Sequence, residues 1–250
     1  VNYPNLVALF KHLDVKTDSS DMSFAVSLKN GQNEYGSSDI NSIFGQRRNI
    51  FSPEFWRMIS DIRKFYREAP KILDEPGRFR DVSLGEYLDQ NKFRTAFIND
   101  FILPMGGAIW STRANEMCEH PVETFVRFFA SHGLLQFGTQ TPWKTVRGGS
   151  REYVQRMIAG ISDSVMVNTA AIKVLKKKNQ VQVVDRHGSD HYFDGVIIAT
   201  HADQALTLLA DPDPLESKIL SCFRYTQNRA VLHTDCSLMP RRRRIWSSWN

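Results

Sequence analysis

The sequence of 250 residues lacks the features that mark several classes of protein. Its three cysteines, Cys118, Cys222 and Cys236, are an odd number and form no CxxC pair, so a disulfide scaffold is not indicated. We expect them to be reduced, buried thiols. No apolar run approaches the ~18 residues of a membrane span. The first residues have neither the basic start nor the apolar stretch of a signal peptide. These absences predict a cytoplasmic protein without a membrane span.

Common catalytic motifs are also missing. There is no GxSxG elbow, no HExxH and no GxxxxGK[ST] phosphate loop. His187 and His191 are four residues apart, but a Gly-Ser turn separates them, so they do not share a helix face and no metal site is expected. A Ser/His/Asp triad stays open on composition alone, although nothing in the sequence positions one.

The charge balance is mild, with 32 Lys and Arg against 27 Asp and Glu and a net charge of +5. Arg241–Arg244, close to Trp246 and Trp249, would suit a nucleic acid. We favour a solvated turn after Met239–Pro240, because a run of four residues offers few phosphate contacts. No nucleic-acid partner is therefore expected.

The first 140 residues are predicted to be mainly helical, with a small sheet near the start. Ser52-Pro53-Glu54 has the cap, the proline and the acid of a helix start. Ser83 and Glu86 match a capping box. The predicted helices cover residues 4–13, 53–69, a short stretch from 84, 92–103 up to Pro104, and 121–132, and a hairpin covers 22–28 and 34–35. The last helix would bury Phe125, Phe128 and Phe129 on one face.

From about residue 141 the pattern changes to short strands. The predicted strands cover residues 164–168, 171–175, 180–185, 191–199 and 223–235, with helices at 151–160, at 203–209 and after Asp213. Lys177-Lys178-Asn179 and His187-Gly188-Ser189 supply turn residues. Val196–Ala199 is apolar without alternation, which is typical of a central strand covered on both faces.

Two segments offer places for a ligand. Gly148-Gly149-Ser150 precedes a helix, so the backbone can be approached closely there and free N–H groups face an anion. The strand that ends at Ala199-Thr200 would present its carboxyl end, where ligands bind in open α/β sheets. Each segment alone is more simply a turn or a core strand.

Together with their order, these segments resemble the middle of the FAD-dependent amine oxidase-like flavoproteins. Further stretches resemble a bacterial-type subfamily of predicted NAD/FAD-binding proteins: Asn2–Leu6, Ser20–Phe24, Gln46–Asn49, Leu103–Met105 with Ala108–Ser111, Phe125–Phe129, His132–Leu135, Ala199–Ala205 and Asn228–Asp235. The resemblance covers nearly the whole chain. The GxGxxG segment with its acidic residue and the C-terminal flavin segment of the family have no counterpart in this sequence. We therefore expect the chain to be an internal portion that binds FAD weakly or not at all by itself and is inactive alone.

The resemblance implies an α+β or α/β fold, with a mostly helical substrate domain, a small mixed sheet and part of a Rossmann-like FAD domain that contains a β-meander. It assigns residues 1–140 to the substrate domain, 141–205 to the FAD-binding domain and 206–250 to a return to the substrate domain.

The resemblance also implies roles for particular residues. Ala171, or Ile172 if the register slips by one, would meet the adenine through its backbone. Arg229 would place a cation near the flavin N5, and the alternative for it is an arginine paired with a carboxylate on a strand. The residues expected to bind FAD are Gly148, Gly149, Ser150, Ala171, Ala199 and Thr200. The residues expected to line a substrate pocket are Trp110, His132, Trp143 and Trp249, although for the tryptophans a core position is at least as good an interpretation.

The predicted function is that of an FAD-dependent oxidoreductase that passes a hydride from an amine or an unsaturated, lipid-like small molecule to flavin N5. Two alternatives stay open: a non-catalytic binding or scaffold module derived from this family, and a basic nucleic-acid binder. The sequence gives no indication of the oligomeric state.

Overall fold

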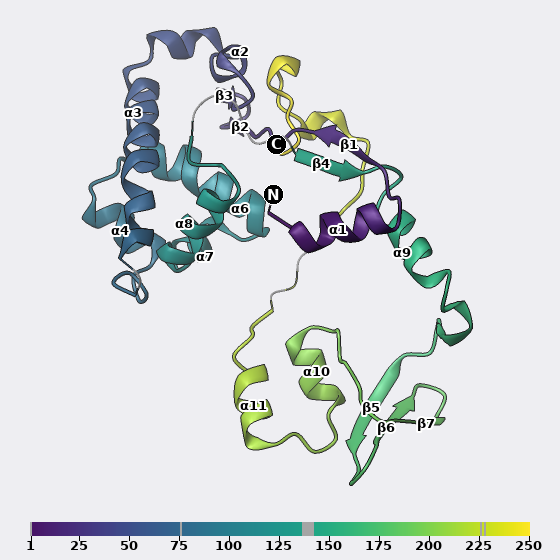
Figure 1. Cartoon of the computed structure of the whole chain (residues 1–250). Coiled ribbons are helices and arrows are strands. Elements are labelled where there is room, and N and C mark those ends of the chain that lie inside the picture. Colours follow the sequence, from purple (N-terminus) through teal and green to yellow (C-terminus); the bar gives the residue numbers. More distant parts are fainter. Residues whose placement is uncertain (1, 76, 137–142, 226, 228) are drawn as a thin grey trace. The chain divides into compact units, whose positions relative to one another are not determined.

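Figure 1 shows the computed structural model of the chain, which describes residues 2–75, 77–136, 143–225, 227 and 229–250. The chain folds into two compact units, residues 1–153 with 232–250, called here the helical unit, and residues 154–231, called the meander unit. The predicted domain boundary at residues 140–141 lies outside the described residues. The assignment of 1–140 and 206–250 to a substrate domain, and of 141–205 to an FAD-binding domain, stays a prediction.

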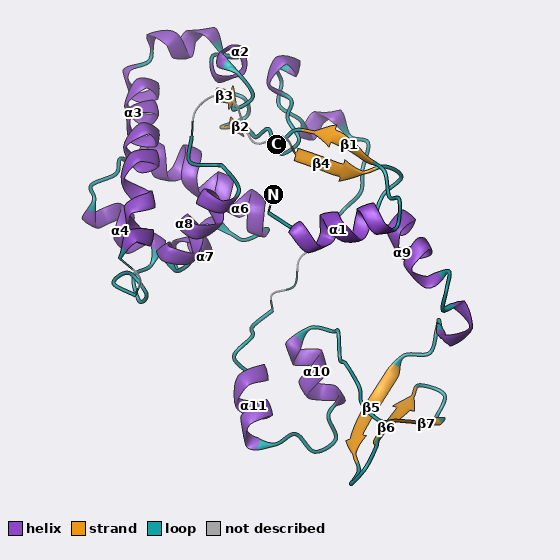
Figure 2. Ribbon diagram, viewed as in Figure 1, coloured by secondary structure: helices purple, strands orange, loops and turns teal. Residues whose placement is uncertain are grey.

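Helices are the main regular structure of the helical unit (Figure 2). They are α1 (Pro4–His12), α2 (Ile40–Ile43), α3 (Pro53–Glu68), α4 (Leu84–Gln90), α5 (Thr95–Phe97), α6 (Leu103–Trp110), α7 (Ala114–Cys118) and α8 (Val122–Ser131), and α9 (Arg151–Ile158) begins there. The 3₁₀ turns are η1 (Arg47–Phe51), η2 (Ala69–Asp74), η5 (Cys236–Leu238) and η6 (Arg243–Ile245), and η3 (Ile98–Ile102) is a π turn. Two antiparallel strand pairs complete the unit, β1 (Thr17–Ser20) with β4 (Trp143–Val146) and β2 (Ala25–Leu28) with β3 (Asn33–Gly36).

Phenylalanine rings fill the centre of the helical unit. Phe65 of α3, Phe97 of α5, and Phe125 and Phe129 of α8 are fully buried. The Phe65 and Phe97 ring centroids are 5.6 Å apart, and those of Phe125 and Phe129 are 4.3 Å apart. The predicted apolar face of residues 121–132 is therefore confirmed for two rings, whereas Phe128 is partly exposed at the edge of the core.

Two of the predicted helix starts in this unit are confirmed with their caps. The Ser52 hydroxyl accepts a hydrogen bond from the Phe55 N–H over 3.2 Å at the start of α3. At α4, the Glu86 N–H donates to Ser83 Oγ over 3.2 Å and the Ser83 N–H donates to Glu86 Oε2 over 2.8 Å. These caps satisfy backbone donors that have no partner inside the helix, which is why the local sequence alone identifies them.

The predicted helix end before Pro104 is wrong. The chain stays helical through α5, η3 and α6, and Pro104 lies in the first turn of α6. Proline has no N–H to offer to the carbonyl four residues earlier, that of Asp100. The π turn η3 lets Leu103 N–H reach the Ile98 carbonyl instead, and the Asp100 carbonyl accepts a hydrogen bond from the Tyr35 hydroxyl. The lost helical bond is thus replaced by a tertiary one.

The pairing of β1 with β4 joins segments more than a hundred residues apart, and no pattern in the sequence indicated it. Both strands have only four residues; β1 is entirely polar and β4 has its apolar residues at the two ends, so neither shows the alternation that predicts a strand. Across the pair, the Arg147 guanidinium donates to the Asp18 carboxylate, with Nη2 2.5 Å from Oδ1. This hydrogen bond lowers the pKa of Asp18.

A buried ion pair attaches the C-terminal segment to the β2–β3 hairpin. The Glu34 side chain is completely buried, and its Oε2 lies 2.5 Å from Nη1 of Arg242. Oε1 accepts hydrogen bonds from the Arg241 N–H (2.7 Å) and the Ser27 hydroxyl (2.9 Å). Burial opposes ionisation of Glu34, but these donors outweigh it and lower its pKa. Within the run Arg241–Arg244, the Arg242 side chain therefore has a structural role, because it forms this ion pair with Glu34.

The meander unit contains the predicted β-meander. Its strands β5 (Ala171–Lys176), β6 (Val181–Asp185) and β7 (Asp190–Phe193) pair antiparallel in that order, followed by α10 (Ala202–Leu208) and α11 (Pro214–Leu220). Asp213 caps α11 as expected. The Asp185 side chain stabilises the turn between β6 and β7. Its Oδ1 accepts hydrogen bonds from the His187 and Ser189 N–H groups, and its Oδ2 lies 2.9 Å from His191 Nε2. The His191 contact is the main reason that the pKa of Asp185 falls to about 2.

Two predicted strands of this part of the chain are wrong, and the predicted strand 191–199 is confirmed only as far as Phe193, where β7 ends. Residues 164–168 contain the end of a 3₁₀ turn, η4 (Ser162–Ser164), and no strand, and the described residues of 223–235 form none either. Residues 194–199 are not a strand, and Ile197 is 95% exposed. A central strand needs hydrogen-bonding neighbours on both sides. None of the described strands pairs with residues 194–199, so the apolar run Val196–Ala199 does not become part of a sheet.

Candidate functional site

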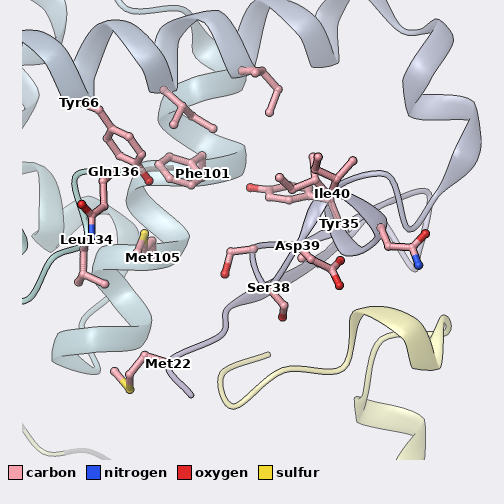
Figure 3. Close-up of a pocket in the computed structure, with 16 residues that line it drawn as sticks. Met22, Tyr35, Ser38, Asp39, Ile40, Tyr66, Phe101, Met105, Leu134 and Gln136 are labelled. Atoms are coloured by element: carbon pink, nitrogen blue, oxygen red, sulfur yellow. The ribbon is translucent and has the colours of Figure 1, made fainter. Parts of the chain in front are cut away.

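The helical unit contains a cavity of about 740 Å³ (Figure 3). This size falls within the range of ~300–1,000 Å³ that is typical of small-molecule sites. Its walls come from the segment around Met22, the end of β3, α2, α3, the π turn, α6 and the segment after α8. The lining residues are Met22, Tyr35, Gly36, Ser37, Ser38, Asp39, Ile40, Asn41, Ile43, Ile59, Ile62, Tyr66, Phe101, Met105, Leu134 and Gln136.

The rim of this cavity is shaped by the start of α2. The Asp39 carboxylate accepts a hydrogen bond from the Ser42 N–H over 2.6 Å, and the Asp39 N–H donates to Ser42 Oγ over 2.9 Å. This reciprocal cap fixes the loop that carries Ser38 to Ile40. The carboxylate of Asp39 is therefore engaged by the backbone of its own helix.

The deeper walls are mainly apolar, with two phenols. Ile59 and Ile62 come from α3, and Met105 comes from α6. Burial raises the pKa of both Tyr35 and Tyr66 well above that of an exposed phenol, so both hydroxyls are neutral near pH 7. Asp39 is the one charged side chain among the described lining residues, and it lies at the rim. The cavity thus suits an uncharged, largely apolar molecule.

The residues predicted to line a substrate pocket lie elsewhere in the helical unit. His132 stacks on Phe128 with 3.9 Å between ring centroids and on Trp143 with 5.7 Å. Trp110 packs against the same Phe128 ring, with 4.9 Å between the ring centroids. Three of the four predicted residues therefore meet in one aromatic stack.

Trp249, the fourth predicted pocket residue, is separate from that stack. Its carbonyl accepts a hydrogen bond from the Ala25 N–H over 2.8 Å, and its side chain packs on the core. Neither Trp249 nor the stack lines the cavity of Figure 3. A role for these four residues in substrate binding stays a prediction. Sequence reasoning missed the cavity, because five separate stretches of the chain contribute to it and none has the motif of a binding site.

The Gly148–Ser150 segment forms the turn between β4 and α9. Both glycines have positive φ angles, +81° at Gly148 and +85° at Gly149. A Cβ atom at Gly149 would meet nothing within 4 Å, whereas one at Gly148 would lie 2.8 Å from Glu152 Cγ. The turn therefore needs glycine for its backbone, and at Gly149 the backbone is open to close approach.

The other predicted cofactor residues lie in the meander unit. Ala171 is in register with Asp185, whereas Ile172 is the extra residue at a register shift in β5. Ala199 and Thr200 are exposed just before α10. Arg229 is exposed in a stretch without regular structure, which corrects the expectation that it lies on a strand. Its neighbour Asn228 lies outside the described residues.

Other kinds of site find no support in the part of the chain that the structure describes. No three His, Cys, Asp or Glu side chains gather there as metal ligands would. None of the described helices has the length and apolar character that crossing a bilayer requires. The three cysteines are free, but Cys222 and Cys236 are exposed, so the prediction of buried thiols is wrong for both.

Comparison with known proteins identifies the family. The family model of the flavin-containing amine oxidoreductases matches residues 2–232. No curated protein matches the chain. Among solved structures, wild-type putrescine oxidase bound to putrescine is 18% identical with a TM-score of 0.59 over 86% of this chain and 49% of that one, and a triple mutant of putrescine oxidase is 17% identical with a TM-score of 0.60 over the same shares. The chain thus spans about half the length of these structures and shares their mixed α+β fold. The match over nearly all of its residues places this chain in the family of flavin-containing amine oxidoreductases.

Proposed function

We propose that this chain is part of an FAD-dependent oxidoreductase that removes a hydride from a small organic substrate. The family assignment carries the proposal, since it covers residues 2–232. Bound FAD would supply the hydride acceptor, and the protein would bind and orient the substrate. The cavity of the helical unit has the volume for such a substrate, and its deeper walls are mainly apolar.

We propose several backbone positions as contacts for FAD. The open backbone at Gly149 suits a polar ligand edge, and the helix α9 that follows offers N–H groups at its start. In β5, Ile172 has no partner in the register with β6, so its backbone groups are better placed than those of Ala171 to bind an adenine edge. Within the helical unit, Ser150 at the start of α9 adjoins Gly149 and is proposed for the same contact. Within the meander unit, we propose the backbone of Ala199 and Thr200, just before α10, as further positions for FAD.

The substrate class follows from the cavity walls. Putrescine oxidase binds putrescine, a diamine, and burying its two ammonium groups in an apolar site would require carboxylate partners. The single described carboxylate of this cavity, Asp39, is at the rim and caps α2. We therefore favour an uncharged, unsaturated or lipid-like substrate over a diamine.

Absorption spectroscopy tests the flavin assignment. This chain alone, mixed with FAD, is expected to retain little of it after gel filtration. A polypeptide that joins this chain to the remaining segments of a family member should purify yellow. In that polypeptide, Ile172→Pro should weaken FAD binding because it removes the N–H proposed to meet the adenine, and Val181→Pro, on the neighbouring strand, controls for damage to the meander. A colourless polypeptide after reconstitution would disprove the enzyme assignment.

A second candidate function is a binding module without catalysis. The observation that favours it is that the whole lining of the cavity belongs to one unit, so a ligand could bind there without flavin. Isothermal titration with an apolar ligand, in the presence and absence of FAD, separates the two candidates. Binding without flavin reduction in a yellow, reconstituted polypeptide would support the module.

A further inference from the structure

A group of exposed apolar and basic side chains lies beside the cavity, and neither the fold nor the proposed function uses it. We call it the docking face. Its apolar members are Ile40, Ile50, Phe51 and Trp56, and its basic members are Lys29, Arg47, Arg48, Arg241, Arg243 and Arg244. All belong to the helical unit.

Contacts within the helical unit join the basic members to one another. Arg241 Cδ lies 2.7 Å from the position of a Cβ atom built on Gly31, at the tip of the β2–β3 hairpin. Arg48 donates to the Gln32 carbonyl of the same tip. η6, which carries Arg243 and Arg244, packs against α2 and β3. The basic side chains therefore gather around one hairpin tip and the adjoining turn.

The apolar members adjoin this basic group through η1. Ile50 and Phe51 end the turn that Arg47 and Arg48 begin. The Trp56 Nε1–H donates to the Ile50 carbonyl over 2.8 Å, and its ring packs 5.4 Å from that of Phe44. Phe51 is 86% exposed and Ile40 is 77% exposed, so both side chains are accessible to a binding partner on this face.

The charge of the face is strongly one-sided. Residues 29–56 and 240–246 contain seven basic side chains and three carboxylates, and one of these carboxylates, Glu34, is neutralised in the buried pair with Arg242. Within the described part of the chain, no ion pair to a carboxylate involves Arg47, Arg48 or any of Arg241, Arg243 and Arg244. An anionic partner would therefore gain charge contacts without breaking an internal ion pair of these arginines.

From this combination we propose that the docking face binds an anionic lipid surface. Clusters of four to eight Lys and Arg residues are typical of proteins that bind acidic headgroups. Exposed large side chains next to such a cluster enter the interface between headgroups and acyl chains. A nucleic acid would use the arginines but would leave Ile40, Ile50 and Phe51 exposed, so a bilayer accounts for both halves of the face.

The position of Ile40 gives this docking a consequence for the cavity. Ile40 belongs both to the docking face and to the lining of the cavity (Figure 3). A bilayer on this face would lie against the cavity rim and deliver apolar molecules to it directly. This consequence rests on the proposed function, whereas lipid binding itself does not.

Co-sedimentation with vesicles tests the proposal. We expect this chain to bind vesicles of phosphatidylcholine with phosphatidylglycerol, to bind vesicles of phosphatidylcholine alone at least tenfold more weakly, and to be released by 0.5 M salt. The double variant Arg241→Gln/Arg244→Gln should bind roughly 25-fold more weakly, at about fivefold for each arginine. Phe51→Ser should lose about tenfold without any change in net charge.

A matched control removes two exposed charges far from the docking face in sequence. Lys178→Gln/Arg186→Gln, in the turns of the meander unit, has the same net charge as the arginine variant and should keep its affinity within twofold. Thermal unfolding monitored by circular dichroism shows whether each variant is folded. Equal loss in the control variant, or unchanged binding by Phe51→Ser, would overturn the proposal. So would tight binding to a DNA duplex with no binding to the acidic vesicles.

Discussion

The buried pair of Glu34 and Arg242 offers the sharpest test of how the helical unit is held together. Glu34 is fully buried, and its carboxylate has three donors, of which only the Arg242 guanidinium carries a charge. Removing one partner of a buried pair costs about 3–5 kcal/mol, because the other charge is left without compensation. Arg242 itself is 34% exposed in its side chain, so we expect Arg242→Met to cost about 3 kcal/mol, at the low end of that range.

This loss is measurable by urea unfolding and by calorimetry. For a unit of this size, 1 kcal/mol corresponds to roughly 2–4 °C in Tm, so the expected fall is about 6–12 °C. Arg243→Met, at the exposed neighbouring position, should change stability by less than ~0.5 kcal/mol. The double variant Glu34→Gln/Arg242→Met should be more stable than Arg242→Met alone, because it no longer buries an unpaired charge. Equal costs for Arg242→Met and Arg243→Met would refute the reasoning.

The same pair predicts a pH dependence of stability. The pKa of Glu34 is lower in the folded chain than its ordinary value of 4.5, so folding favours the ionised form. Its contribution is complete above that ordinary value and is lost as the pH falls through the lowered pKa. The wild-type chain should therefore lose more stability between pH 5 and pH 3 than Glu34→Gln does. Parallel stability–pH curves for the two would contradict the assigned charge state.

The remaining predictions concern other parts of the chain. Phe125→Ala should cost about 3–5 kcal/mol in urea unfolding and Phe128→Ala clearly less, because only the first ring is fully buried; equal costs would argue against the core described. The pKa of Asp185 is lowered to about 2, mainly by His191, so its contribution should persist above pH 4 and be lost toward pH 2; Asp185→Asn should abolish that acid step in amide exchange of β6 and β7. In a flavin-containing polypeptide, Arg229→Ala should spare FAD absorbance but slow flavin reduction by substrate in stopped-flow measurements; an unchanged rate would remove the role proposed for Arg229.

The features that were predictable from the sequence are those fixed by neighbouring residues. Ser52-Pro53-Glu54, the Ser83 capping box and the Asp213 cap all act within four residues, and each is found in the structure. The meander turn His187-Gly188-Ser189 is also local, with Gly188 at φ +82°. Such signals do not depend on how distant segments pack, so reading them requires no knowledge of the fold.

The features that were missed depend on distant partners. β1 and β4 form a strand pair only because residues 17–20 and 143–146 meet, and neither segment has a strand pattern of its own. The opposite error occurs at Val196–Ala199, where the pattern is that of a central strand but the described chain supplies no neighbouring strand. Apolar character predicts that a segment prefers to be buried, whereas the partner that buries it is a property of the whole sheet.

The cavity illustrates why a site of this kind has no sequence signature. Pro104 removes an N–H from the helix that runs from Thr95 to Trp110, and the Asp100 carbonyl becomes available to another donor. The Tyr35 hydroxyl, on the distant β3, donates a hydrogen bond to that carbonyl. This bond fixes the Tyr35 ring as one wall of the cavity. Phe101, next to Asp100 in the π turn, forms another wall. By itself, the proline predicts a helix end and the tyrosine predicts a core residue. The cavity in which we propose that the substrate binds depends on the hydrogen bond between Tyr35 and the carbonyl that Pro104 leaves free.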